Sequence, residues 1–222
     1  MRYEKGRKDA SRSRIMEAAA DRFRSDGIAA TGLAGIMSEV GLTNGAFYPH
    51  FPSKAALIHE CVSKALDEQL DQLQGAMAAG GVEAVVGAYL SAAHRDNPAK
   101  GCASAALLPE LARAPADTRQ LYTEYLQTLA GKLAAALPKQ NKDDTQAAFG
   151  ILATLIGTLQ LARAVNDADL SDQLLEAGKN AVRTVARSSR KNKRTSPGGR
   201  DADARTHVSA LHAKARSKKG KR

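Results

Sequence analysis

The segment from residue 31 to residue 57 constrains the fold of this chain more than any other stretch. Its first apolar residues recur at helical spacing: Leu33, Ile36, Met37 and Val40. Gly41 is expected to end that helix, because only a residue without a Cβ adopts the left-handed conformation cheaply. Thr31 is expected to cap this helix, and Thr43 the next one, which spans only residues 44–48. Such a short helix persists only when it packs on neighbours. The segment therefore predicts a helix-turn-helix, whose second helix enters the major groove of DNA.

The rest of the chain predicts an all-α protein. Alanine and leucine dominate, tryptophan is absent, and the runs of Val, Ile and Thr that are typical of strands are missing. Helical periodicity predicts helices over residues 9–26, 53–74, 82–95, 116–136, 144–164 and 169–187. Between residues 100 and 119 we expect a helix that is interrupted at Pro109. From residue 188 to residue 222 the periodicity disappears, which predicts a basic disordered tail.

The net charge of +10 is unevenly distributed along the chain. Residues 1–64 hold ten Lys/Arg and seven Asp/Glu, whereas residues 65–186 hold ten and fourteen. Residues 187–222 hold thirteen Lys/Arg against two Asp/Glu. Such a tail is expected to attach to DNA phosphates without reading sequence. The alternative is that it only keeps the protein in solution.

Cysteine content and hydropathy predict the compartment. Two cysteines are too few for a disulfide framework and fit a reducing cytoplasm. The charged N-terminus is unlike a secretory signal, and we find no run of about 18 apolar residues that would span a membrane. We therefore expect a cytoplasmic protein that has no membrane partner.

The helix-turn-helix segment matches a known pattern in a single register. The matching positions are Thr31, Ile36, Val40, Gly41, Thr43, Gly45, Tyr48, His50, Phe51, Ser53, Lys54 and Leu57. They resemble the TetR/AcrR family of bacterial regulators, and Arg12, Ile15, Ala18, Ala19, Phe23 and Gly27 agree with its first helix. The resemblance implies a three-helix DNA-binding head at residues 9–69, with its reading motif at 32–51. A long helix would join this head to a helical regulatory and dimerisation domain at residues 70–187.

The candidate DNA contacts lie at and just after the start of the reading helix. Thr43, Asn44, Gly45 and Ala46 occupy the end that points into the groove, where Ala46 can touch a thymine methyl group. The resemblance implies that the Tyr48 hydroxyl binds a phosphate. The remaining candidates are Thr31, His50 and Lys54, of which Lys54 would clamp a phosphate at a helix start. The alternatives are that Thr43 only caps, that His50 bonds within the motif, and that Lys54 is merely solvated.

Specific reading requires two copies of so small a motif, spaced about one helical turn, ~34 Å, apart. A homodimer is therefore predicted, and the resemblance places its interface in residues 144–187. It also implies a pocket for a small effector in the preceding helices. The candidate ligand contacts are Tyr89, His94, Cys102, Glu110 and Tyr122. The leucine-rich surroundings suit an apolar or aromatic ligand, although plain core packing is the alternative for each residue.

Cys102 has a second interpretation. Residues 101–113 resemble a subgroup of the family that includes electrophile- and oxidant-sensing repressors, and Lys100 adds positive charge beside the thiol. The alternative, which we favour, is a small buried residue that packs well.

Other classes of function find little support in the sequence. We find no phosphate-binding glycine loop, no His-Glu-x-x-His motif and no cysteine pairs at zinc spacing. The five histidines are scattered, so no enzyme, cofactor or metal site is predicted. The sequence predicts a ligand-responsive DNA-binding regulator of transcription, more specifically a repressor on a palindromic operator. The alternative is a non-specific nucleic-acid-binding or chromosome-organising protein that is driven by the basic tail.

Overall fold

The computed structural model describes residues 2–137 and 144–188, with side chains from residue 6 onward. Throughout these ranges the regular structure is helical, so the predicted all-α fold is confirmed there. The elements are, in order, α1 (Arg2–Asp26), α2 (Leu33–Glu39), the 3₁₀ turn η1 (Asn44–Ala46), α3 (Lys54–Tyr89), α4 (Ala92–Asp96), the 3₁₀ turn η2 (Pro98–Lys100), α5 (Ala103–Leu111), α6 (Ala116–Ala136), α7 (Asp144–Ala164) and α8 (Ala168–Ser188). The tail predicted for residues 188–222 lies outside the described residues, except for Ser188 at the end of α8.

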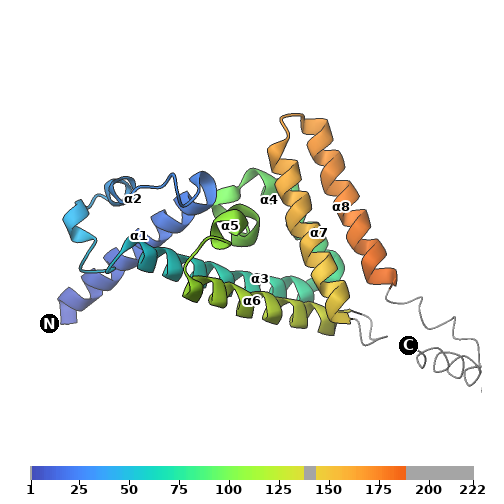
Figure 1. Cartoon of the computed structure of the whole chain (residues 1–222), viewed down its shortest axis with the longest axis horizontal. Helices are drawn as coiled ribbons and strands as arrows, with labels where there is room; N and C mark the ends of the chain where they lie inside the picture. Colours follow the sequence, from blue (N-terminus) through green and yellow to red (C-terminus); the bar gives the residue numbers. More distant parts are fainter. Residues whose placement is uncertain (1, 138–143, 189–222) are drawn as a thin grey trace, which may run out of the picture. The chain divides into compact units, whose positions relative to one another are not determined.

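The N-terminal head consists of α1, α2, η1 and the start of α3 (Figure 1). Its core is formed by side chains that are fully or almost fully buried: Ile15, Phe23, Ile36, Met37, Phe47, Phe51 and Leu57. Gly41 has a φ of 70°, as predicted. It ends α2 in a Schellman motif, because the Leu42 N–H donates to the Met37 carbonyl at 2.8 Å and the Gly41 N–H to the Ser38 carbonyl at 3.0 Å.

Three expectations about the head were wrong. Helix α1 begins at Arg2, well before residue 9. Gly32 holds the N-cap position of α2, and Thr31 is buried with its hydroxyl donating to the Gly27 carbonyl at 2.7 Å. The reading helix is a single 3₁₀ turn followed by turns, because Pro49 has no N–H and disfavours helical geometry in the residue before it.

Helix α3 also runs further than predicted. Ser53 caps it, accepting from the Ala56 N–H at 3.1 Å. The helix passes Gln74 and kinks at Gly80 and Gly81, where Gly81 has a φ of 64°. The predicted helix over residues 82–95 is broken after Tyr89. There Ser91 caps the separate helix α4 by accepting from the His94 N–H at 3.2 Å.

Helix α5 contains Pro109, which was expected to interrupt it. A proline leaves the carbonyl four residues earlier without its helical donor. Here that carbonyl belongs to Ala105, and the Gln160 side chain of α7 donates to it from Nε2 at 3.1 Å. A distant amide thus replaces the missing N–H, and α5 continues to Leu111.

The C-terminal helices form a hairpin that packs on α5 and α6. Figure 1 shows α7 and α8 lying side by side, and the two helices make extensive contacts. A Cβ on Gly178 would lie 2.5 Å from Thr158, so this glycine permits the close approach of the two helices. Among the described residues, α7 alone has the length and composition of a membrane span, a test that core helices also pass. Its residues Ile151, Leu155 and Leu159 are buried in the core.

Candidate nucleic-acid interface and effector cavity

The η1 turn presents polar groups at the surface above a rigid aromatic base. Thr43, Asn44 and Gly45 are exposed. Beneath them Phe47 and Phe51 are 1% and 0% exposed, and their rings stack with centroids 5.5 Å apart. Burial of these two rings fixes a turn that could not hold its conformation alone. The exposed backbone and side chains of η1 can therefore approach a ligand without rearrangement.

Tyr48 is the exposed aromatic residue of this surface. It is 64% exposed, and its ring contacts that of Phe47 edge to face with centroids 5.4 Å apart. A hydroxyl on a ring held in this way is suited to donate to an anionic oxygen. Ala46 is half-buried beside it and packs against the core.

Two of the predicted DNA contacts are engaged inside the head. The Lys54 ammonium donates to the Ile28 carbonyl at 2.9 Å, so it ties α3 to the loop after α1. The hydroxyl of Thr31 bonds to Gly27 as described above. Both side chains therefore stabilise the head in this structure.

His50 is half-buried, and its Nδ1 has no hydrogen-bond partner among the described residues. Burial lowers the pKa of His50, and the positive charges of Lys8 and Arg12 lower it further. The imidazole is therefore neutral at neutral pH, with cations beside it.

A cavity of about 200 Å³ lies among α3, α6, α7 and the segment that leads into α5. Its apolar wall includes Leu73, Val85, Leu129, Leu152 and Leu155. Its polar members include Gln69, Tyr89, His94, Cys102, Ser104 and Tyr125. The structure thus brings together three of the five predicted ligand contacts, namely Tyr89, His94 and Cys102.

The other two predicted ligand contacts do not line this cavity. The Glu110 carboxylate accepts from the Ala29 N–H at 3.0 Å, so it joins α5 to the loop between α1 and α2. Tyr122 lies next to Tyr125, a residue of the cavity wall, and the two ring centroids are 5.9 Å apart. The end of α5 turns toward the head and away from the cavity, so Glu110 does not belong to the cavity wall.

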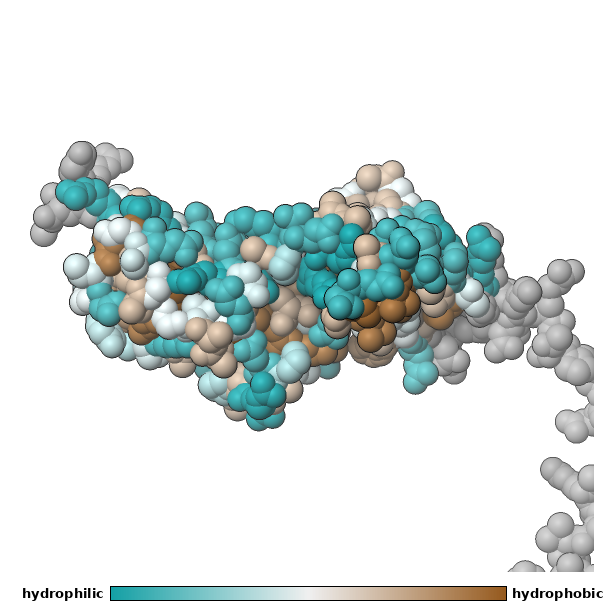
Figure 2. All heavy atoms as spheres, turned by 90° about the horizontal axis from the view of Figure 1, so that it is seen from above, coloured by the Kyte–Doolittle hydropathy of each residue, from teal (hydrophilic) through white to brown (hydrophobic). Residues whose placement is uncertain are grey.

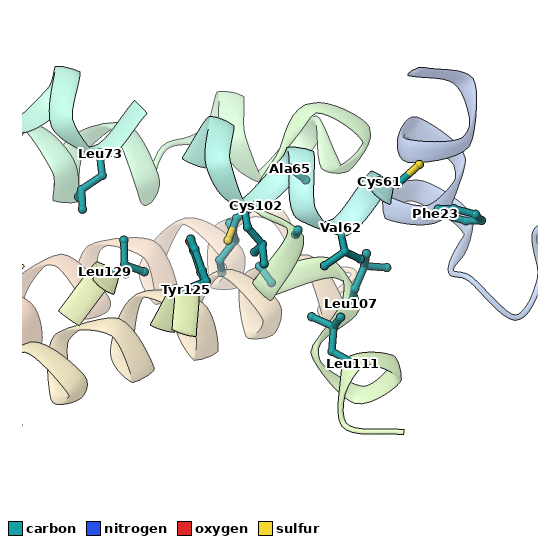
Figure 3. Packing of buried hydrophobic residues seen from close by; sticks show 14 of the residues in the cluster. Phe23, Cys61, Val62, Ala65, Leu73, Cys102, Leu107, Leu111, Tyr125 and Leu129 are labelled. Carbon is teal, nitrogen blue, oxygen red and sulfur yellow. The ribbon is translucent and has the colours of Figure 1, made fainter. Parts of the chain in front are cut away.

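Gln69 organises the polar side of the cavity. Its Oε1 accepts from the Cys102 thiol at 3.3 Å and from the Tyr125 hydroxyl at 3.0 Å. Figure 3 shows the Cys102 sulfur pointing toward Tyr125. Sequence reasoning missed Gln69, although a signal exists: it continues the buried stripe of α3 midway between Ala65 and Leu73.

His94 holds the backbone of Cys102 in place. Its Nδ1 lies 2.7 Å from the Tyr89 carbonyl, so this nitrogen carries the proton, and Nε2 accepts from the Cys102 N–H at 3.0 Å. Burial lowers the pKa of His94, which favours this neutral form. A Cβ on Gly101 would lie 2.9 Å from both the His94 and the Arg163 side chains. A larger residue at position 101 would therefore displace the His94 imidazole or the Arg163 guanidinium.

Residues 98–102, which we call the strap, connect this cavity to the head. Lys100, Gly101 and Cys102 line the cavity. On its other side the strap binds α1, because Arg24 donates to the Ala99 carbonyl and Lys100 pairs with Asp21 at 2.5 Å. One short segment thus contacts both the cavity and the first helix of the head.

Comparison with known proteins agrees with this architecture. Residues 15–61 match the family model described as bacterial regulatory proteins, tetR family. A TetR-family regulator from Cytophaga hutchinsonii is similar in structure, with a TM-score of 0.68 and 20% identity over 80% of this chain and 96% of that chain. A TetR-family regulator from Streptomyces coelicolor has a TM-score of 0.67 and 21% identity, with coverages of 81% and 95%.

A third similar structure is the reduced form of NemR from E. coli, with a TM-score of 0.66 and 17% identity over 79% of this chain and 96% of that chain. No curated protein sequence matches the chain.

Residues 15–61 form a helix-turn-helix head that matches the tetR family model, and a larger helical part follows it. The helices beyond the head share the fold of TetR-family transcriptional regulators.

Proposed function

We propose that this protein is a dimeric transcriptional repressor of the cytoplasm, released from its operator by a small effector. In this proposal residues 9–69 bind DNA through the motif at 32–51, and residues 70–187 bind the effector and the partner protomer. The observation that carries the proposal is the exposed η1 turn on its buried aromatic base, together with a cavity whose wall contacts α1.

The proposed DNA contacts are the exposed groups of the reading turn. Thr43, Asn44, Gly45 and Ala46 would face base edges, and the Tyr48 hydroxyl would bind a phosphate. Thr31 is assigned to the stability of the head instead, because its hydroxyl already donates to the Gly27 carbonyl. Lys54 uses one of its three N–H donors on the Ile28 carbonyl, so its ammonium can also bind a phosphate.

Selection of bound duplexes from a random library tests this proposal directly. We expect a palindromic sequence, because a symmetric dimer presents two reading turns. Tyr48→Phe, which removes one hydroxyl from an exposed ring, should weaken binding to the selected duplex without changing its sequence. Uniform coverage of all duplexes would instead support a non-specific DNA-binding protein, and undiminished binding by the variant would remove Tyr48 from the interface.

The proposed dimer interface is the outward face of the α7–α8 hairpin. Large apolar side chains are exposed there: Phe149 at 41%, Leu161 at 58% and Leu170 at 43%. A Cβ on Gly150 or Gly157 would meet no atom of this chain within 4 Å, so both glycines leave room for a neighbouring helix. Figure 2 shows hydrophobic surface interrupting the hydrophilic exterior near the C-terminal helices. A helix pair from each protomer would cover such a surface.

Sedimentation of Leu161→Asp tests this interface. A buried aspartate would cost several kcal/mol if the side chain faces a partner protomer, so we expect a monomer. Gln127→Asp, at an exposed position of α6, is the control and should leave the dimer intact. A Leu161→Asp protein that sediments as a tight dimer would exclude this placement.

The proposed effector is small and mostly apolar, because leucine and valine side chains form much of the cavity wall. Its occupancy would act on α1 through the strap. Thiol chemistry at Cys102 is the alternative route, and Cys102→Ser separates the two. Release of DNA by a quinone that persists in this variant would exclude the thiol route.

A further inference from the structure

Helix α1 extends beyond the part of the chain that the family model covers. The match to the family model begins at residue 15, whereas α1 begins at Arg2. Ile15 is also the first buried side chain among those described. The preceding turns of α1 therefore project from the head, as Figure 1 shows near the N-terminus.

The projecting turns carry basic residues on the face that elsewhere contacts the core. Positions three to four and seven to eight residues apart share one face of a helix. Arg12 precedes Ile15 by three residues, and Lys8 and Arg7 precede it by seven and eight. The apolar stripe of α1 is thus followed by basic residues beyond the head, with Asp9 among them.

Contacts of Arg12 fix the direction of this cationic stripe. Its guanidinium lies over the Phe51 ring at 4.6 Å from the centroid and forms an ion pair with Glu60. The stripe is therefore aligned with the side of the head that holds the reading motif. Lys8 is one turn further out on the same face, near enough to His50 to oppose its protonation.

The outer cations of the stripe have no acidic partner among the side chains that the structure describes, which begin at residue 6. Arg12 is neutralised by Glu60, whereas no described carboxylate forms an ion pair with Arg7 or Lys8. Both residues are exposed. Two exposed cations on a helix, beside the turn that carries His50, suit a polyanion that extends past that turn.

We propose that Arg7 and Lys8 bind backbone phosphates of DNA next to the phosphate bound by Tyr48. This inference rests on the proposed function, because it requires that the head docks on DNA through the η1 turn. The two residues would add affinity without reading base sequence, since a phosphate has the same chemistry at every base pair.

Salt dependence of binding tests the proposal in the full-length protein. A phosphate contact contributes about 0.9 to the slope of log affinity against log salt concentration. We expect Arg7→Gln/Lys8→Gln to reduce this slope by about one to two per protomer, and to leave the preferred sequence unchanged. The measurement is fluorescence anisotropy with the duplex recovered by selection and with a mixed-sequence duplex of equal length.

Two matched variants control for indirect effects. Arg7→Lys/Lys8→Arg keeps both charges and should restore the slope of the parent protein. Lys132→Gln removes an exposed charge from α6 and should leave the slope unchanged. Equal thermal midpoints of all variants would show that the head remains folded.

Either of two results would overturn the inference. An unchanged slope in Arg7→Gln/Lys8→Gln would show that these residues do not reach phosphate. A changed sequence preference would show that they contact bases. Failure of the proposed function looks different: the parent protein would then bind both duplexes equally, and the slope comparison could still be made on the mixed-sequence duplex.

Discussion

At the scale of single residues, Tyr89 holds a buried hydroxyl that has no hydrogen-bond partner among the described residues. The neighbouring Cys102 thiol donates to Gln69. Burial, with Cys102 as the next cause, raises the pKa of Tyr89 well above its ordinary value. An unsatisfied buried hydroxyl costs free energy, whereas the hydroxyl of Tyr125 is satisfied by Gln69.

Tyr89→Phe is therefore expected to stabilise the protein. Removing the unpartnered hydroxyl should raise the free energy of unfolding by about 1 kcal/mol, or the melting temperature by about 2–4 °C. Tyr125→Phe is the matched variant and should lower the free energy of unfolding by about the same amount. Calorimetry checks both. Equal destabilisation by the two substitutions would mean that the Tyr89 hydroxyl has a favourable partner.

The pH dependence of stability follows from two histidines. The folded protein holds the pKa of His50 and of His94 below 6.5, chiefly through burial. Below pH ~6.5 the unfolded chain therefore binds protons more readily than the folded chain does. The free energy of unfolding consequently decreases as the pH decreases. Urea midpoints should decrease from pH ~7.5 to ~5.5, and less steeply for His94→Gln. A midpoint that is constant over this range would contradict the assignment.

Local chemistry made several of these residues predictable. Gly41 and Ser53 act within one helical turn of their own backbone, so a sequence of a few residues suffices to place them. The bond from Lys54 to the Ile28 carbonyl could not be predicted, because this carbonyl becomes available only after α1 and α3 have packed. The role of Gln69 likewise depends on Cys102 and Tyr125, which come from distant parts of the chain.

At the scale of elements, α5 and α7 are joined by a hydrogen bond that replaces a missing one. Gln160→Ala should lower the free energy of unfolding by about 1–2 kcal/mol, because the Ala105 carbonyl loses its donor. In a Pro109→Ala background the loss should be smaller, since residue 109 then supplies its own N–H. Denaturant titrations of the four proteins form a double-mutant cycle. Strict additivity would show that Gln160 does not compensate for Pro109.

Helix boundaries were predicted well where residues next to the boundary in the sequence decide it. They were predicted poorly where contacts with distant residues decide it. The limits of α6 and α7 agree with the predicted ranges 116–136 and 144–164. Helix α3 passed its predicted end because Ala76 and its neighbours remain good helix formers until Gly80. Pro109 failed to break α5 because the compensating amide lies on another helix, which no local pattern indicates.

At the scale of the whole molecule, basic residues are concentrated toward the two ends of the chain. Residues 187–222 hold thirteen Lys/Arg against two Asp/Glu, although residues 189–222 lie outside the described structure. Removing residues 189–222 should flatten the salt dependence of DNA affinity and preserve the selected sequence. Anisotropy titrations over a range of salt concentrations check this. A truncated protein with the salt slope of the full chain would leave the tail with no part in binding.

The strap also determines how such a regulator can diverge after gene duplication. Leu129 and Leu152 face the cavity from α6 and α7, so exchanging them would alter the shape of the cavity while α1 is untouched. A side chain at position 101 would instead displace the His94 imidazole or the Arg163 guanidinium. We expect descendants of this gene to change the cavity through α6 and α7 more readily than through the strap.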